Sequence, residues 1–416
     1  MVEEILIEEK TRETTLEEEF DASALEIEPV EAVPRRLASI DFVKGIAIIF
    51  IIIAHVAAAW LDEQWIFIYG FVYAFLDILG PSLFIFLSAL SVVFSINRKK
   101  GHLPKKAIRN TIFSRGLSML LIGSLINFAL NGADLPFPSC LWGWNIISFI
   151  GLSQIVCYYT IKLKRSTRIV IGVIIIFTSE MIREAIWSLS RAEPIFYALW
   201  FALDSPEATT TILPWIAVCF ITTVFGELLY EAMMDGSDKS YRHLFRVFVL
   251  WGGILFVFGI ITGLETVLPT LGNINGNLYK FDVYYAAIKQ PFVYYPGMWK
   301  FLVRGTFSNI WYTMGTSFLI VAAAFYLTDI KKKDNILIGM IKFYGTVSLN
   351  LFLMHYLLTP FFSAYMTILV LPYFVVTYIG LLGVLFHIWY RYWDGMFSPE
   401  WLMQKISSIG VRNKSK

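Results

Sequence analysis

The chain contains 416 residues, of which 57% are hydrophobic, 17% aromatic and only 16% charged. A soluble protein of this size carries about 25% charged residues. Apolar stretches of roughly 20 residues recur along the whole sequence, and each is long enough to cross a bilayer as a helix. The composition therefore excludes an ordinary soluble domain and predicts an all-α polytopic membrane protein.

Acidic and basic residues are unevenly distributed, although the formal net charge is only +2. Residues 1–34 contain 12 of the 32 acidic residues and only two of the 34 basic ones, which leaves 20 acidic and 32 basic residues in the remainder. Because residues 1–34 lack the basic region and cleavage site of a signal peptide, we expect a disordered cytoplasmic tail there, with partner docking as the alternative role. Residues 35–405 are expected to form the membrane domain, and residues 406–416 a basic C-terminal tail.

Ten segments have the length and composition of membrane-spanning helices. Lys and Arg are concentrated in the connections that follow the second, fourth, sixth and eighth segments, and the other connections contain more Pro, Gly and Asn. By the positive-inside rule, this alternation predicts a bundle of about ten helices with both termini cytoplasmic. The ten segments are 37–60, 78–97, 108–130, 144–163, 168–188, 212–234, 244–263, 307–328, 339–364 and 370–391.

The first segment carries a single histidine, His55, near its far end. At 1.5 Å per residue, the distance from Leu37 to His55 is about 27 Å, which is nearly the thickness of the hydrocarbon core. The histidine is therefore expected near the face opposite to the N-terminus. An ionisable side chain at such a depth is costly and indicates function, here a general base. The alternative is an interfacial histidine that hydrogen-bonds a neighbouring helix.

The cytoplasmic ends of the first and third segments carry charges that suit an anionic ligand. Asp41 and Lys44 lie three residues apart and share a helix face, either as a structural pair or as part of a ligand site. Arg109 and Arg115 begin the third segment after a run of lysines, and such a cluster is typical of phosphate binding. The alternative for these cations is the positive-inside signal itself.

Three further polar residues interrupt apolar sequence. Asp77 lies just before Gly80-Pro81, where a broken segment would line a cavity, although an interfacial aspartate is an equal alternative. His355 lies within the ninth segment, with Asn350 a turn and a half earlier. We expect these two side chains either to face the same cavity or to bridge helices.

Two other features have simple and functional interpretations. Glu180 and Arg183 have the spacing of an ion pair on the surface of the fifth segment. The loop at 264–306 is long and rich in Tyr, Trp, Pro and Asn, which suits either a lid that binds carbohydrate or a membrane-interface belt. The three cysteines have no CxxC spacing, and we expect neither a disulfide nor a metal site.

The first segment also carries a recognisable motif. The stretch R-L-A-S-I-D-F-V-K-G-I-A-I-I, followed by A-H-V, resembles the first-helix signature of the transmembrane acyltransferases. It is most similar to heparan-alpha-glucosaminide N-acetyltransferase catalytic domains and, more distantly, to the acyltransferase-3 family. Further matching motifs follow in the family's order: G-P-S-L-F-I-F-L-S-A-L-S (80–91), N-I-I-S-F-I-G-L (145–152), I-L-P-W (212–215), G-T-V-S-L-N-L-F-L-M-H (345–355) and S-P-E-W-L (398–402).

The resemblance implies transfer of an acyl group, usually acetyl, from cytosolic acyl-CoA to a sugar hydroxyl or amine on the opposite face. By this resemblance, His55 is the catalytic histidine, as a base or as an acyl relay. Asp41 and Lys44 would help to build the donor site, and His355 would face the same cavity. The chain departs from the family at Lys44, where Arg is usual, and at Ala89, where Gly is common. Lys lacks the planar fork that binds phosphate through two hydrogen bonds.

A multi-pass transporter or flippase of a polar or lipid-linked substrate is the competing hypothesis, because the same polar groups would suit a substrate pathway. The expected partners are the bilayer, acyl-CoA as the co-substrate, a glycan or glycolipid acceptor and a second copy of the chain. No nucleic acid or metal cofactor is expected. The plasma membrane is the expected location.

Overall fold

The computed structural model describes residues 37–65, 72, 74–101, 103–131, 136–204, 211–267, 298–355, 366–403 and 405. All of them belong to one compact unit, Arg36–Lys416. The predicted tails at 1–34 and 406–416, and most of the aromatic loop at 264–306, lie outside the described residues.

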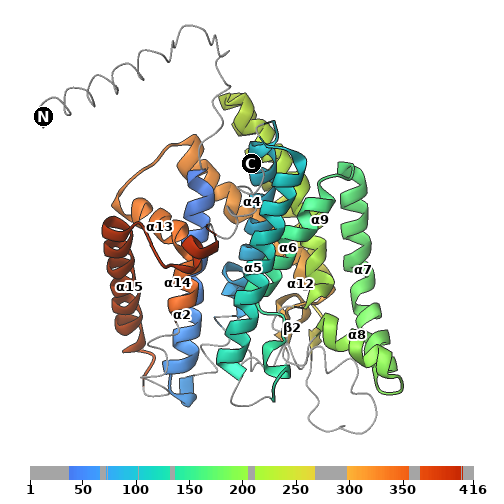
Figure 1. Cartoon of the computed structure of the whole chain (residues 1–416). Helices are drawn as coiled ribbons and strands as arrows, with labels where there is room; N and C mark the ends of the chain where they lie inside the picture. Colours follow the sequence, from blue (N-terminus) through green and yellow to red (C-terminus); the bar gives the residue numbers. More distant parts are fainter. Residues whose placement is uncertain are drawn as a thin grey trace, which may run out of the picture. The chain divides into compact units, whose positions relative to one another are not determined.

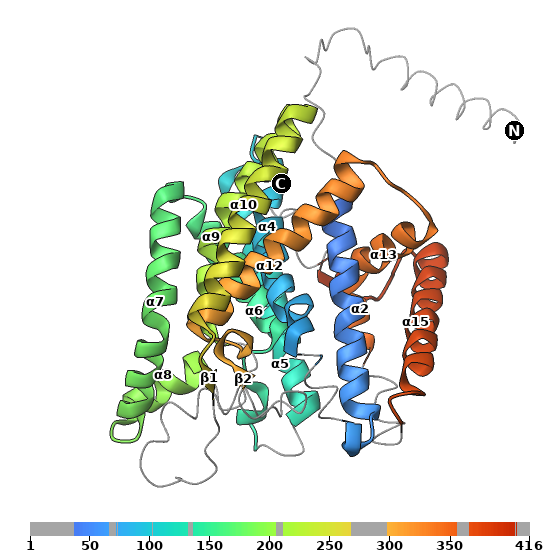
Figure 2. The same cartoon turned by 180° about the vertical axis from the view of Figure 1, so that it is seen from behind.

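The described residues confirm an all-α polytopic membrane protein (Figures 1 and 2). A short antiparallel pair, β1 (Thr266–Val267) and β2 (Met298–Trp299), is the strand structure among them. The short helical turns are η1 (Glu63–Trp65), η2 (Asp77–Leu79), η3 (Ser139–Leu141), η4 (Lys300–Leu302) and the π-helical η5 (Tyr326–Ile330). The α-helices are α2 (Ala38–Trp60), α4 (Pro81–Lys99), α5 (Lys105–Asn131), α6 (Ile146–Thr160), α7 (Arg165–Ser190), α8 (Pro194–Asp204), α9 (Ile212–Asp235), α10 (Asp238–Thr262), α12 (Phe307–Phe325), α13 (Ile336–Thr346), α14 (Ser348–Met354) and α15 (Leu371–Trp393).

Within the described residues, each of the ten predicted segments contains a helix. Seven of them are long and apolar enough to cross a membrane, and an eighth is a bent pair, α13 and α14, which meet at 73°. The ninth segment is therefore bent where a continuous helix was expected, and its end, 356–364, lies outside the described residues. The helix α6 is short, at 15 residues, and α7 carries charged residues toward both ends. The number of crossings thus stays a prediction.

Small residues bring several helices into close contact. A Cβ atom on Gly45 of α2 would lie 1.9 Å from the carbonyl oxygen of Ile341 on α13. In the same pair of helices, a Cβ atom on Gly345 would lie 1.8 Å from the carbonyl oxygen of Asp41. Membrane helices associate through such small residues because lipid offers no hydrophobic driving force between them. Gly45 therefore serves the close packing of two helices.

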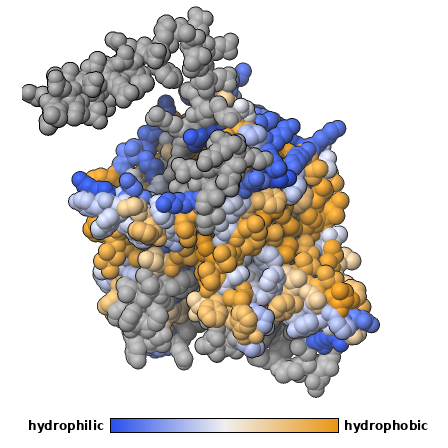
Figure 3. Space-filling view, in the orientation of Figure 1, coloured by the Kyte–Doolittle hydropathy of each residue, from blue (hydrophilic) through white to orange (hydrophobic). Residues whose placement is uncertain are grey.

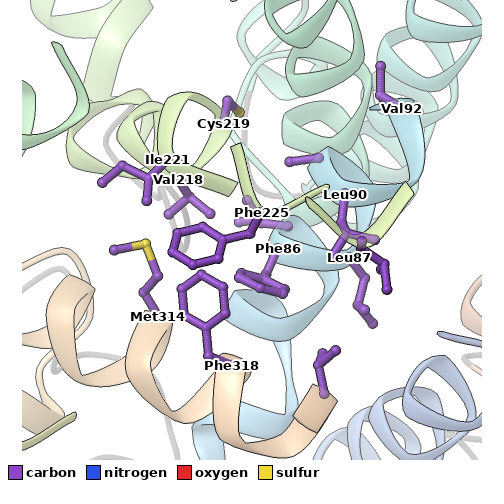
Figure 4. Close-up of a cluster of buried hydrophobic side chains, with 14 of the residues drawn as sticks. Phe86, Leu87, Leu90, Val92, Val218, Cys219, Ile221, Phe225, Met314 and Phe318 are labelled. Atoms are coloured by element: carbon purple, nitrogen blue, oxygen red, sulfur yellow. The ribbon is translucent and has the colours of Figure 1, made fainter. Parts of the chain in front are cut away.

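Aromatic side chains fill the interface between α4, α9 and α12 (Figure 4). The ring centroid of Phe318 lies 4.2 Å from that of Phe225 and 4.8 Å from that of Phe86. All three rings are buried. This core holds α12 in place, and with it the segment that precedes α12.

The bundle has two chemically different ends, with hydrophobic surface between them (Figure 3). We call the end where α2 and α5 begin and α4 ends the basic end, because Lys99, Lys105 and Arg109 lie there. The end where α2 finishes and α12 begins is called the opposite end. The histidine His55 lies on α2 toward the opposite end.

Candidate active site

Two histidines that are far apart in sequence meet toward the opposite end of the bundle. The Nδ1 atom of His55 lies 2.8 Å from the Nε2 atom of His355, and the ring centroids are 5.0 Å apart with an interplanar angle of 27°. His355 is fully buried, whereas His55 is partly exposed. The structure therefore brings together two of the residues that the sequence singled out, and we call this pair the histidine dyad.

The second contact of His355 defines the protonation pattern of the neutral dyad. Its Nδ1 atom lies 2.5 Å from the carbonyl oxygen of Phe352, and a carbonyl only accepts, so Nδ1 carries the proton. The Nε2 atom of His355 is then an acceptor, to which the Nδ1–H of His55 donates. The lone pair of neutral His55 is therefore on Nε2. This order of contacts resembles that of a catalytic triad, in which a second group holds the base in one tautomer.

The bend between α13 and α14 positions His355. It directly follows the last residue of α14, and its backbone N–H donates to the carbonyl oxygen of Leu351 (3.0 Å). Its own carbonyl oxygen accepts a hydrogen bond from the hydroxyl of Tyr378 on α15 (2.6 Å). The Phe352 ring packs against both imidazoles, with centroids 6.5 Å from His55 and 5.4 Å from His355. Contacts from α2, α14 and α15 thus hold the second histidine in place.

Asp77 is buried and paired with an arginine that the sequence did not indicate. The Nε and Nη2 atoms of Arg304 donate to the two carboxylate oxygens of Asp77, and the Nε contact is 2.5 Å long. Asp77 is only 7% exposed, so it is not a solvated interfacial aspartate. Arg304 lies in the loop before α12, where a charge is usually solvated. No signal in the sequence distinguished it from other loop cations.

The segment that carries Arg304 is held by Glu180 and Arg183 of α7, and Arg183 is itself held by Asp204 of α8. The backbone N–H of Phe307 donates to Glu180 Oε1 (2.7 Å), and Lys300 Nζ lies 3.3 Å from Glu180 Oε2. Arg183 donates to both carboxylate oxygens of Asp204 (3.0 and 2.8 Å) and to the carbonyl oxygen of Gly305 (3.3 Å).

The expectation of an ion pair between Glu180 and Arg183 on the helix surface is therefore wrong. Their helical spacing allowed it, but each found a partner on another element during packing. Both residues fix the start of α12.

Asn350 bridges three parts of the chain and does not contact the dyad through its hydrogen bonds. Its side-chain amide donates to the hydroxyl of Tyr390 on α15 (2.7 Å) and accepts from the backbone N–H of Glu400 (3.3 Å). The residue is fully buried. Of the two alternatives for Asn350, the structure supports a bridge between helices.

The four predicted donor-binding residues lie at or near the basic end, with Asp41 and Lys44 on α2 and Arg109 and Arg115 on α5. Arg109 and Arg115 are both exposed on α5, and six helical residues turn them about 120° apart. Arg115 shares a flank of α5 with Ile122 and Ile126, two residues that pack against the hydrophobic cluster of α2, α14 and α15.

The surroundings of Arg115 are charged. It interacts electrostatically with Lys99 at the end of α4 and with Glu400 near the C-terminus. Asp41 is buried in the first turn of α2, and Lys44 is partly exposed on the same helix.

The described residues contain no group of three or more His, Cys, Asp or Glu side chains that could hold a metal ion. The three cysteines are buried and free.

Fold and site together define a multi-pass membrane protein with a dyad of histidines inside a bundle of helices. The catalytic-domain model of heparan-alpha-glucosaminide N-acetyltransferase matches residues 36–261, which is more than half of the chain. The chain belongs to this family, which makes it a membrane acetyltransferase whose relatives in general use acetyl-CoA. No curated protein matches the chain. The matched range includes His55 and Asp77, whereas Arg304, Asn350 and His355 follow it.

Proposed function

We propose that this protein transfers an acyl group, most simply acetyl, from cytosolic acyl-CoA to a sugar hydroxyl or amine of a glycan or glycolipid on the other face of the membrane. The observation that carries the proposal is the histidine dyad, because its hydrogen bonds place the free lone pair of neutral His55 on Nε2. Membership of an acetyltransferase family supports the same chemistry.

In this proposal, His55 acts through Nε2. As a general base, it takes the proton of the acceptor hydroxyl or amine while the acceptor attacks the thioester carbonyl. As a relay, Nε2 attacks the thioester itself and carries the acyl group before the acceptor receives it. His355 is the positioning residue in both routes, since it holds the tautomer through Phe352. In this proposal Asp77 does not contact the reacting atoms; it holds Arg304 in place through hydrogen bonds.

The donor would enter at the basic end, which we place in the cytosol together with both termini. Arg115 is the principal candidate for the CoA phosphates, because it is exposed on a flank of α5 that faces the helices of the dyad. Asp41, Lys44 and Arg109 would contribute at the mouth. The thioester must then reach a point within about 3–3.5 Å of the acceptor atom near His55. Residence in the plasma membrane and assembly with a second copy belong to the proposal as well.

A transporter or flippase is the second candidate, and one observation favours it. The bend of 73° between α13 and α14 lies at the start of the short helix that ends at His355, and broken helices near a polar site are typical of transporters. Such a protein would use the dyad to bind a polar substrate and would leave acyl-CoA intact.

The decisive experiment measures acetyl-CoA binding and thioester cleavage by the purified full chain in detergent. We expect the wild-type protein to bind and slowly cleave acetyl-CoA, and His55→Ala to bind it without cleavage. His243→Ala is the matched control, because His243 is exposed on α10 and lies outside the dyad. If the wild-type protein does not bind acetyl-CoA at micromolar concentrations, the acyltransferase proposal fails and the transporter becomes the preferred hypothesis.

A further inference from the structure

The Asp77–Arg304 pair lies beside the part of α2 that leads to His55. The turn η2, which begins at Asp77, packs on α2 in a hydrophobic cluster that includes Phe50, Ala54 and Ile78. A Cβ atom on Gly80, at the end of η2, would lie 3.9 Å from Ile51. Ile51 precedes His55 by four residues, so the two share a helix face. The turn that carries Asp77 therefore packs on α2 about one helical turn before His55.

The residues Leu302 and Val303, which directly precede Arg304, pack in the same hydrophobic cluster as Phe50 and Ala54 of α2, and Ala54 is the chain neighbour of His55. A cation that is largely shielded from water is costly unless it is paired, and Asp77 pairs Arg304.

We propose that Arg304 is the cation that stabilises the oxyanion of the acyl-transfer step at His55. This inference rests on the proposed function and adds a catalytic residue to it. Acyl transfer passes through a tetrahedral intermediate, and a fixed donor aimed at its oxygen is worth more in a dry site than in water. A guanidinium suits this role because it stays charged and donates in a rigid planar fork.

The step balances without another reactant. The acceptor oxygen or nitrogen forms a bond to the thioester carbon, the electrons of the carbonyl π bond move to its oxygen, and the acceptor proton goes to Nε2 of His55. The carbonyl then re-forms, the carbon–sulfur bond breaks, and the thiolate of CoA leaves with the proton from His55. Arg304 faces the negative oxygen while His55 is positive, so it stabilises the state with separated charges.

The surroundings of Arg304 provide the rigidity that this role needs. Its fork is held by both oxygens of Asp77, and the neighbouring Gly305 is held by Arg183. Phe307 and Lys300 on either side of it are bound by Glu180. Four contacts thus fix a short segment, and such fixed dipoles and charges cost no reorganisation during the reaction.

The test compares Arg304→Ala, Arg304→Lys and His55→Ala in the full chain, with acetyl-CoA as donor and glucosamine as acceptor. We expect Arg304→Ala to lower kcat about a hundredfold to a thousandfold, with little change in KM for acetyl-CoA. Arg304→Lys is expected to retain part of the rate, because it keeps the charge and loses the fork. Low, non-denaturing guanidinium should restore part of the rate of Arg304→Ala. The matched control is Arg165→Ala, which removes an exposed guanidinium that pairs with Glu227 and lies far along α7 from Glu180 and Arg183.

The outcomes separate this inference from the proposed function. If His55→Ala is inactive while Arg304→Ala keeps the wild-type kcat, the oxyanion role is overturned and the acyltransferase proposal stands. If His55→Ala keeps the wild-type rate, the proposed function itself fails. If Arg304→Ala does not fold, Arg304→Lys decides: a wild-type KM with reduced kcat supports the role, and an unchanged kcat with raised KM overturns it.

Discussion

The two ends of the bundle differ in how far their charged side chains are exposed. Toward the opposite end, the charged side chains of Asp77, Arg304, Arg183 and Asp204 are buried in pairs. At the basic end, Lys105 and Arg109 at the start of α5 are exposed, although Arg168 is buried there and pairs with Glu227. Buried pairs impose one geometry because an unpaired charge in the interior is costly, whereas exposed cations impose none. The first arrangement suits a reaction, and the second suits capture of a charged ligand and orientation in the membrane.

Removal of one member of a buried pair should have the largest effect. We expect Arg183→Ala to lower the free energy of unfolding by about 3–5 kcal/mol, since Asp204 is left buried without its partner. Thermal unfolding of the purified protein in detergent measures this loss. The double variant Arg183→Met/Asp204→Leu should recover most of the stability, because it leaves no buried charge. Equal stability of the two variants would contradict the interpretation.

The dyad makes the next prediction. His355→Ala should lower kcat about a hundredfold, roughly 2.7 kcal/mol of activation free energy, because His55 loses the group that holds its tautomer. The KM for acetyl-CoA should stay near the wild-type value, since the predicted donor site is at the other end. A raised KM with an unchanged kcat would show that His355 binds the donor instead.

The contact between α2 and α13 can be tested with two glycines of α13. Gly345→Ala should destabilise the protein by about 1–3 kcal/mol, since the new methyl group would overlap the carbonyl oxygen of Asp41. Gly339→Ala is the matched control: no atom lies within 4 Å of its Cβ position, and an alanine favours the helix. Equal melting temperatures for the two variants would argue against close packing of these helices.

The smallest effects are expected among the exposed cations. Arg115→Gln should raise the KM for acetyl-CoA about tenfold, or roughly 1.4 kcal/mol, with little change in kcat. Arg109→Gln should change it by less than about twofold, because a solvated cation contributes little. Titration of acetyl-CoA at two salt concentrations measures both. Equal effects of the two substitutions would contradict the different orientations of these residues on α5.

The sequence located most of the helices correctly but did not predict the bend in the ninth segment. Hydropathy registers the apolar length of a segment, and residues 336–354 are apolar on both sides of the bend. The bend depends on tertiary packing. It directs α14 so that His355 contacts His55, whereas a straight continuation of α13 through Met354 would follow a different path. The short helix α8 was not predicted either, because its 11 residues are too few to cross a membrane.

The candidate site was predicted in part. His55, His355 and Asp77 stood out because ionisable side chains are rare in apolar sequence. Arg304 did not, because it lies in a loop where charged residues are common. The expected surface pair of Glu180 and Arg183 was wrong, since helical spacing describes neighbours on one helix and says nothing about partners on another.

The sequence by itself determined the class of this protein, the positions of its helices and the presence of a histidine deep in the first of them. These properties depend on local composition, because each apolar stretch responds to the membrane on its own. Only the tertiary structure decided that His55 meets His355, that Asp77 holds Arg304 and that α7 clamps the start of α12. These contacts join residues more than 100 positions apart, and they form only because helix packing leaves buried polar groups to satisfy one another.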